Sequence, residues 1–349
     1  MHDSANRRPA ITVLLGDPAL PDHSKPGGAF TADDFDQVER LKSALAKLDR
    51  YAFEFRNDHS QLLAELQARP PEFVLNFCDT GFRNDATLEL HVTALLEMLG
   101  VPFSGSGPVP LGLCYDKALV RALAGELGIP VPRELVLAPG EELGEELGEM
   151  RYPAFVKPNR GDGSVGITTR SLVHDAAAAR AYVDELRELL PGATILVQEF
   201  LSGTEYGVGL IGNPGRGFTS LPVLEVDYSA LDPSLPRLLD YSSKTDPDSP
   251  YWQHVRFRAA QLPAGTCDEL HARCQALFGR LGLRDYARFD FRADAHGEIK
   301  LMEVNPNPAW CWDGKLAHMA GVLGKDHAWL LGTILHAAGE RTGRAFPKP

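Results

Sequence analysis

The sequence predicts an α/β protein, because short apolar segments alternate with segments whose apolar residues recur every three or four positions. Residues 11–15 and 73–77 are continuous apolar runs of the kind found in buried strands. Residues 33–48 place their apolar side chains on one face of a helix. Strands that alternate with helices imply a parallel sheet with helices on its faces.

The rest of the chain continues this alternation. Further strands are expected at 51–55, 154–158, 167–169, 194–200, 206–211, 221–226, 287–291 and 299–304. Further helices are expected at 62–68, 88–99, 117–127, 175–190, 267–281 and 320–338. Residues 228–263 show little periodicity, and a long loop of this kind is more often functional than idle.

Length and composition set limits on the function. The 349 residues fit two or three domains. We expect a cytoplasmic protein, because the N-terminus lacks the apolar core of a signal peptide and the five scattered cysteines argue against a disulfide framework. No apolar run is long enough to span a membrane. The net charge of −12, without a long basic run, argues against binding to nucleic acid.

A glycine-rich segment at 161–166 lies between two predicted strands. Glycines let backbone amides approach an anion, so the segment fits a phosphate-binding loop that closes over a nucleotide. An ordinary β-hairpin turn is the alternative. The segment is neither a Walker A sequence nor a Rossmann glycine motif. Lys157 just before it and Lys117 at a predicted helix start could each be an ordinary surface residue.

Two neighbouring predicted strands carry a set of residues suited to metal and phosphate chemistry. Arg288 and Asp290 are two positions apart, as are Glu303 and Asn305, so each pair projects from one face of its strand. If the strands form a hairpin, all four side chains share a face. Carboxylate and amide oxygens suit magnesium held together with phosphates, and an arginine can stabilise an oxyanion. The alternative is an amphipathic hairpin whose polar face lies in water.

Several motifs occur in the order seen in the ATP-grasp superfamily, and within it the sequence resembles the D-alanine–D-alanine ligase family. The matching segments are 104–107, 115–117, 155–166, 197–206, 240–244, 288–290 and 303–308. The resemblance covers about the last two-thirds of the chain by motif and the first third by outline. It implies a three-domain ATP-grasp architecture, with an N-terminal parallel-sheet domain at 1–113, an α+β lid domain at 114–199 and a catalytic domain at 200–349. A homodimer is also implied.

The resemblance implies ATP and two Mg²⁺ ions, or Mn²⁺, as cofactors. The ATP-binding positions would be Lys117, Lys157, Gly163, Ser164, Val165, Gln198, Glu199, Phe200, Leu201, Glu205, Lys244 and Met302. The metal ligands would be Asp290, Glu303 and Asn305, and the catalytic residues Arg288, Lys244 and Ser164. In the implied reaction, a substrate carboxylate attacks the γ-phosphate to give an acyl-phosphate. An amine then displaces phosphate and forms an amide.

The sequence departs from the family at the positions that hold amino-acid substrates. The first loop at 16–24, the segment 76–85 and the stretch 309–314 all leave the family pattern. We therefore expect a carboxylate–amine ligase for amino-acid-like small molecules other than two D-alanines. The weaker substrate candidates are Arg83, Tyr241, Trp310 and Lys315. The alternatives are a D-alanine–D-alanine ligase of cell-wall synthesis and a nucleotide-binding regulator that has lost catalysis.

Overall fold

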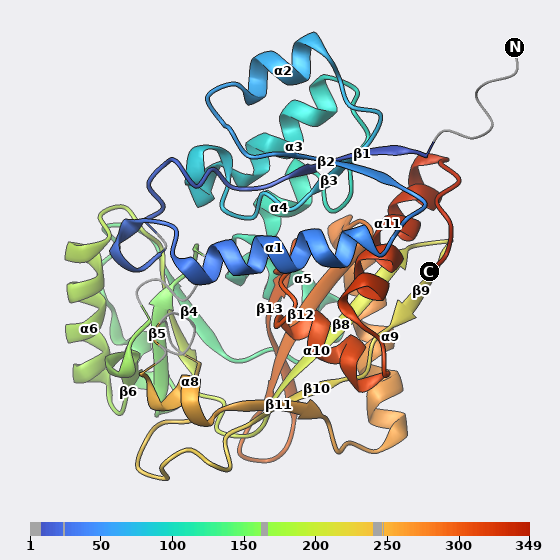
Figure 1. The fold of residues 1–349 in the computed structure, drawn as a ribbon. Coiled ribbons are helices and arrows are strands. Elements are labelled where there is room, and N and C mark those ends of the chain that lie inside the picture. The colour runs from blue at the N-terminus through green and yellow to red at the C-terminus, as the bar shows by residue number, and fades with distance from the viewer. Residues whose placement is uncertain (1–7, 24, 162–166, 240–245, 247) are drawn as a thin grey trace, which may run out of the picture.

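A computed structural model describes residues 8–23, 25–161, 167–239, 246 and 248–349, and three sheets organise this part of the chain (Figure 1). The predicted mixture of helices and sheets is confirmed. The strands of each sheet lie within one of the predicted ranges 1–113, 114–199 and 200–349. For this reason we propose those boundaries as the domain divisions.

The N-terminal sheet has three parallel strands in the order β2-β1-β3, as the alternating pattern predicts. Its strands are β1 (Ala10–Leu14), β2 (Ala52–Arg56) and β3 (Val74–Asn76). Its helices are α1 (Ala32–Ala46), α2 (Leu62–Ala68), α3 (Glu89–Met98) and α4 (Pro108–Cys114). A capping box between Thr31 and Asp34 satisfies the backbone amides that begin α1.

The second sheet is antiparallel, in the order β4-β7-β5-β6. Its strands are β4 (Glu134–Leu137), β5 (Ala154–Pro158), β6 (Leu172–Val173) and β7 (Ile195–Glu199), and α5 (Lys117–Glu126) and α6 (Ala176–Leu189) belong to the same part of the chain. The strand predicted at 167–169 is wrong. The Thr168 hydroxyl accepts a bond from the Arg170 amide, and Ser171 accepts one from the Thr168 amide. These bonds turn the chain into a short 3₁₀ helix before β6 begins.

The third sheet follows the order β11-β10-β8-β12-β13, with β9 on β8. Its strands are β8 (Glu205–Asn213), β9 (Gly217–Ser220), β10 (Leu224–Asp227), β11 (Arg256–Ala259), β12 (Tyr286–Ala293) and β13 (Ile299–Asn305). The helices here are α8 (Pro250–His254), α9 (Ala264–Leu281), α10 (Lys315–Val322) and α11 (His327–Thr342). The predicted loop at 228–263 therefore contains α8 and β11.

A single closing helix at 320–338 is also wrong, because α10 and α11 are separate helices. Gly324 adopts a φ of +69° between them, a conformation that glycine tolerates and other residues rarely adopt. Asp326 then begins the second helix, since its side chain accepts a bond from the Trp329 amide.

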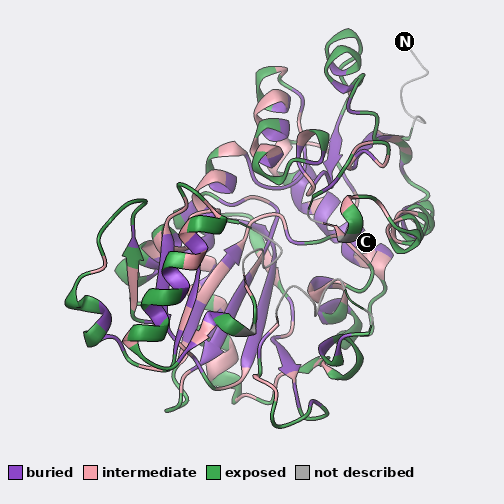
Figure 2. Ribbon diagram, turned by 90° about the vertical axis from the view of Figure 1, so that its left-hand side faces the viewer, coloured by how far each residue is buried: buried purple, intermediate pink, exposed green. Residues whose placement is uncertain are grey.

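The core joins the N-terminal sheet to the end of the chain. Ile11 and Val13 of β1 belong to the same buried cluster as Leu331 and Ile334 of α11. Strand interiors are buried and the outer faces of most helices are exposed (Figure 2). This shared core fixes the N-terminal sheet against the third sheet.

Arg121 of α5 ties the second sheet to the third. Its side chain is almost fully buried. Its Nε donates to Glu134 of β4 at 3.0 Å, and its Nη1 donates to the carbonyl of Met302 in β13 at 2.7 Å. An uncompensated buried carboxylate is costly, so the guanidinium and Glu134 depend on each other.

We therefore predict that Arg121→Met lowers the free energy of unfolding by about 3–5 kcal/mol, because it leaves the Glu134 carboxylate without its charged partner. Urea unfolding measures the change. The matched control is Arg69→Met, which removes an exposed arginine 3.4 Å from Glu54 and should change stability by less than about 1 kcal/mol. Equal effects in the two variants would contradict the role given to Arg121.

Candidate active site

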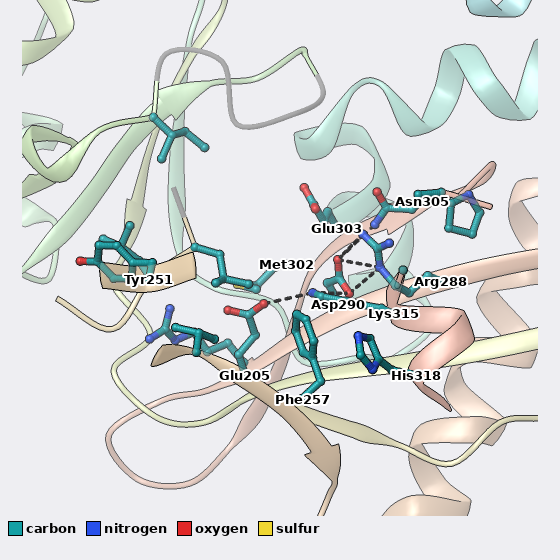
Figure 3. Close-up of a pocket in the computed structure, with 18 of the residues that line it drawn as sticks. Glu205, Tyr251, Phe257, Arg288, Asp290, Met302, Glu303, Asn305, Lys315 and His318 are labelled. Carbon is teal, nitrogen blue, oxygen red and sulfur yellow. Dashed lines mark hydrogen bonds and ion pairs between the residues drawn. The ribbon is translucent and has the colours of Figure 1, made fainter. Parts of the chain in front are cut away.

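A cavity of about 780 Å³ collects most of the described residues that the sequence predicted as functional (Figure 3). Those that line it are Lys157, Gln198, Glu199, Phe200, Leu201, Glu205, Arg288, Asp290, Met302, Glu303, Asn305 and Lys315. They come from β5, β7 and the segment that follows it, β8, β12, β13 and α10. Because ligand sites are concave and combine apolar walls with a few convergent polar groups, this cavity is the candidate active site.

The predicted hairpin of β12 and β13 is confirmed. Asp290 pairs with Glu303, and Arg288 pairs with Asn305, so the four side chains share a face. A register shift after Asp290 leaves Met302 as an extra residue on β13. Leu301 consequently remains in the core while Met302 and Glu303 both line the cavity. Simple alternation of strand residues would not place these two neighbours together.

Asp290 is the most heavily bonded carboxylate of the site. Its Oδ1 accepts from Arg288 Nε at 2.9 Å and lies 3.3 Å from Lys315 Nζ. Its Oδ2 accepts from Arg288 Nη2 at 2.9 Å and from Asn305 Nδ2 at 3.2 Å. Burial opposes its ionisation, but Arg288 and Lys315 outweigh burial and hold the pKa of Asp290 well below its usual range.

Glu205 lies beside this group, two residues from the position on β8 that pairs with Asp290. Its Oε1 is 3.2 Å from Lys315 Nζ, and its Oε2 accepts from the Tyr228 hydroxyl at 3.1 Å. Burial, reinforced by the Glu205 charge, raises the pKa of Tyr228 far above its ordinary value, so the phenol stays a neutral donor.

Lys157 projects from the end of β5 into the other side of the cavity. Its Nζ donates to Gln198 Oε1 at 3.1 Å, and Gln198 Nε2 donates to Glu134 at 2.9 Å. Burial lowers the pKa of Lys157 to about 7, Arg121 adds to this effect, and Glu303 opposes it. An anionic ligand would therefore stabilise the charged form of this buried lysine.

The segment that follows β7 forms an apolar slot. Phe155 and Phe200 stack with ring centroids 6.3 Å apart, and Leu201 and Met302 line the same cavity. The Glu199 side chain anchors the segment, because its Oε1 accepts from Lys300 Nζ at 2.7 Å and from the Arg133 amide at 3.1 Å. A flat aromatic base would fit such a slot.

Other predicted residues lie elsewhere. Lys117 is not among the cavity residues, although its Nζ donates to the carbonyl of Gly161 at 2.5 Å, next to the glycine-rich segment. Arg83 is exposed and does not line the cavity. Trp310 packs on Phe77 and donates its indole N–H to the Phe77 carbonyl at 3.0 Å, so its partly buried ring packs against the core.

Five predicted positions fall outside the described residues: Gly163, Ser164, Val165, Tyr241 and Lys244. The cavity also contains residues that the sequence analysis did not select, among them Gln37, Asp79, Asn307, Cys311, Asp313 and His318. Asp79 lies in the segment 76–85, and Cys311 and Asp313 lie in 309–314, both of which depart from the family pattern. That departure is the sequence signal that could have identified these three residues.

The polar face fits a divalent metal bound together with phosphates. Asp290, Glu303 and Asn305 offer hard oxygen atoms of the type magnesium prefers. Among the described residues, no group of three or more His, Cys, Asp or Glu side chains could hold a metal by itself. A site with two carboxylates and an amide suits an ion that takes its remaining ligands from a nucleotide and water.

Comparison with known proteins defines the class. A sequence model described as D-ala D-ala ligase C-terminus matches residues 124–336. The crystal structure of D-alanine–D-alanine ligase from Bacillus anthracis complexed with ATP superposes with a TM-score of 0.70 at 20% identity, over 96% of this chain and 98% of that one. The VanG D-Ala:D-Ser ligase from Enterococcus faecalis gives a TM-score of 0.66 at 16% identity, over 95% and 100%. The fold is therefore that of an ATP-grasp ligase.

Sequence relatives define the family. An uncharacterized protein, y4sG, from Sinorhizobium fredii is 30% identical over 252 residues, which cover 72% of this chain and 70% of the relative. A D-alanine–D-alanine ligase from Marinomonas sp. is 30% identical over 265 residues, which cover 73% and 74%. The chain belongs to the D-alanine–D-alanine ligase family. It is an ATP-dependent ligase that forms a carbon–nitrogen bond between small molecules.

The described helices include none that is long and apolar enough to cross a membrane.

The depressed pKa of Lys157 predicts a pH-dependent change in stability. The unfolded value is 10.5 and the folded value is about 7. The folded state therefore carries a penalty that is fully present below pH 7 and disappears as the pH rises towards 10.5. We expect Lys157→Met to stabilise the ligand-free protein near pH 7, by on the order of 2 kcal/mol after allowing for the lost bond to Gln198.

Urea unfolding across this pH range measures the effect. The difference between Lys157→Met and the wild type should shrink steadily as the pH rises. Lys325→Met, which removes an exposed lysine, should show no such trend. A Lys157→Met variant that is destabilised equally at every pH would contradict the assignment.

Proposed function

We propose that this protein joins the carboxylate of one amino-acid-like molecule to the amine of another through an acyl-phosphate, using ATP and Mg²⁺, and that its substrates are not two D-alanines. The observation that supports the proposal best is the convergence of Lys157, Glu205, Arg288, Asp290 and Glu303 in one cavity. Each residue has a separate task in phosphoryl and acyl transfer.

The nucleotide would extend from the apolar slot to the metal ligands. Its base would lie between Phe200 and Met302 and meet the backbone of Glu199 and Leu201, with Gln198 at its edge. Its ribose hydroxyls would donate to Glu205, whose carboxylate is oriented by Tyr228. Lys157 would bind the phosphates, and the buried ammonium would gain the anionic partner that it lacks in the free protein. Lys117 and Lys244 would add phosphate contacts, as the resemblance implies.

Glu303 and Asn305 would hold Mg²⁺, and the resemblance implies Asp290 as a third ligand. When bound, the metal would neutralise the oxygens of the transferred phosphoryl group. Arg288 is fixed by Asp290 through two guanidinium nitrogens, so its orientation is set before any substrate arrives. From this position it would stabilise the acyl-phosphate and the oxyanion that forms when the amine attacks.

The lining near the end of β13 supports substrates other than two D-alanines. The cavity residues of the loop that follows β13 include Ala309, Cys311, Asp313 and Gly314, which bring neither a hydroxyl nor a cation to the cavity wall. A second D-alanine presents a carboxylate, which Asp313 would repel. The D-Ala:D-Ser ligase among the structural neighbours supports the same idea. By its name, that ligase takes D-serine in place of the second D-alanine, and it has the same fold.

A D-alanine–D-alanine ligase of cell-wall synthesis is the second candidate, favoured by the names of the relatives. Steady-state assays that pair carboxylate and amine substrates decide between the two. The proposal expects ADP and phosphate release with a pair other than two D-alanines. Robust ADP release with D-alanine alone, matched by dipeptide formation, would contradict it. Tight ATP binding without turnover on any pair would instead indicate a regulator.

Glu303→Gln should lower turnover by roughly 10²–10³-fold, because it removes a negative charge from the metal site. The fold should be intact, as judged by circular dichroism and thermal unfolding. Glu298→Gln changes an exposed carboxylate at the turn of the same hairpin and should leave turnover within about twofold of the wild type. Unchanged turnover in Glu303→Gln would mean that the metal site lies elsewhere.

A further inference from the structure

Lys315 places an ammonium group between two buried carboxylates in the cavity (Figure 3). Its Nζ is 3.2 Å from Glu205 Oε1 and 3.3 Å from Asp290 Oδ1. The Lys315 side chain is 13% exposed, and the two carboxylates are 7% and 4% exposed. Buried charges persist in proteins when they are paired, so this lysine is a structural component of the site.

The fold holds Lys315 in this place. It is the first residue of α10, directly after the N-cap residue Gly314. Its aliphatic stem passes Gly207, the residue of β8 that pairs with Asp290. A Cβ atom at Gly207 would lie 3.8 Å from Lys315 Cδ and 3.6 Å from Asp290 Oδ1. These are ordinary van der Waals distances, so the lysine stem lies directly beside β8 and next to the carboxylate.

The oxygens of Asp290 are already occupied by protein donors. Oδ1 receives Arg288 and Lys315, and Oδ2 receives Arg288 and Asn305. An ionised carboxylate offers about four lone-pair positions, and these bonds use them. A metal ion that binds Asp290 directly must first displace Lys315 or Asn305.

Glu303 and Asn305 can still accept a metal. Because Asn305 gives its amide nitrogen to Asp290, its carbonyl oxygen points away from that carboxylate. Glu303 pairs with Asp290 across the hairpin and lies near enough to Lys157 to raise the pKa of that lysine. One ion can therefore bind Glu303, Asn305 and a nucleotide without disturbing Lys315. A second ion would need Asp290, whose lone pairs Lys315 helps to occupy.

We propose that Lys315 takes the place of one of the two divalent ions implied by the resemblance, so that the site binds a single ion with each nucleotide. This inference rests on the ATP and metal chemistry proposed above. The ammonium neutralises Asp290 and Glu205 from a fixed position, and it leaves Glu303 and Asn305 as the ligands of the remaining ion. Asp290 then orients Arg288 and Lys315 and does not coordinate metal.

The competing idea is that Lys315 turns away when metal arrives and binds a substrate carboxylate instead. In that case two ions would enter with the nucleotide. The number of bound ions therefore separates the two roles, and it can be read without any turnover.

The experiment titrates Mn²⁺ into the full-length protein saturated with a non-hydrolysable ATP analogue, and electron paramagnetic resonance of free Mn²⁺ gives the number bound. We expect one ion per chain in the wild type and in Lys315→Arg, which keeps the charge. Lys315→Met should bind two, because it exposes Asp290. Lys325→Met is the control for loss of an exposed lysine, and it should bind one.

Two ions in the wild type would overturn the inference while leaving the proposed function intact. One ion in both the wild type and Lys315→Met would also overturn it, because Lys315 would not be what excludes the second ion. If the wild type fails to bind the Mn²⁺–nucleotide pair at all, the proposed function itself is wrong. Should Lys315→Met not fold, the wild-type and Lys315→Arg values still decide the first outcome.

Discussion

The antiparallel register of β12 and β13 is the constraint on which the rest of the site depends. It sets Asp290 opposite Glu303 and Arg288 opposite Asn305. A slip of one residue would turn each polar side chain to the other face of the sheet. The register is held from behind, since Phe289, Phe291, Leu301 and Val304 are buried in a core shared with α9. Burial of one face thereby fixes the chemistry of the other.

Compensation of buried charge is the second principle of the site. Arg288 and Lys315 neutralise Asp290, and Arg121 neutralises Glu134 beneath Gln198. Lys157 is the exception, because burial lowers its pKa to about 7. A site in which Asp290 and Glu205 are already paired with cations, while Lys157 has no ion-pair partner among the described residues, is prepared for a polyanion. This charge pattern agrees with the ATP-dependent chemistry of the family.

Much of this arrangement could be predicted from local sequence. The hairpin and its shared polar face follow from the two-residue spacing of Arg288 and Asp290. The strand at 167–169 could not be recognised as wrong, because the capping bonds of Thr168 depend on side chains three residues apart in a polar segment. The long closing helix failed for a related reason: its apolar period continues across Gly324, where the backbone turns.

Long-range contacts were beyond sequence reasoning. Trp310 was a candidate for substrate binding, but the Phe77 carbonyl that receives its indole N–H follows β3, which is distant in the chain. Lys315 was also a candidate for substrate binding, and it lies against two carboxylates of the protein. Arg121 belongs to none of the recognised motifs, and only the fold brings its guanidinium to the carbonyl of Met302.

The central claim is that this register assembles one nucleotide and metal site at the cavity. The most direct measurement is a crystal structure of the full-length protein with Mn²⁺ and a non-hydrolysable ATP analogue, with anomalous scattering to locate manganese. We expect the triphosphate beside Lys157 and manganese bound to Glu303 and Asn305. A triphosphate elsewhere on the protein, or manganese remote from β13, would contradict it.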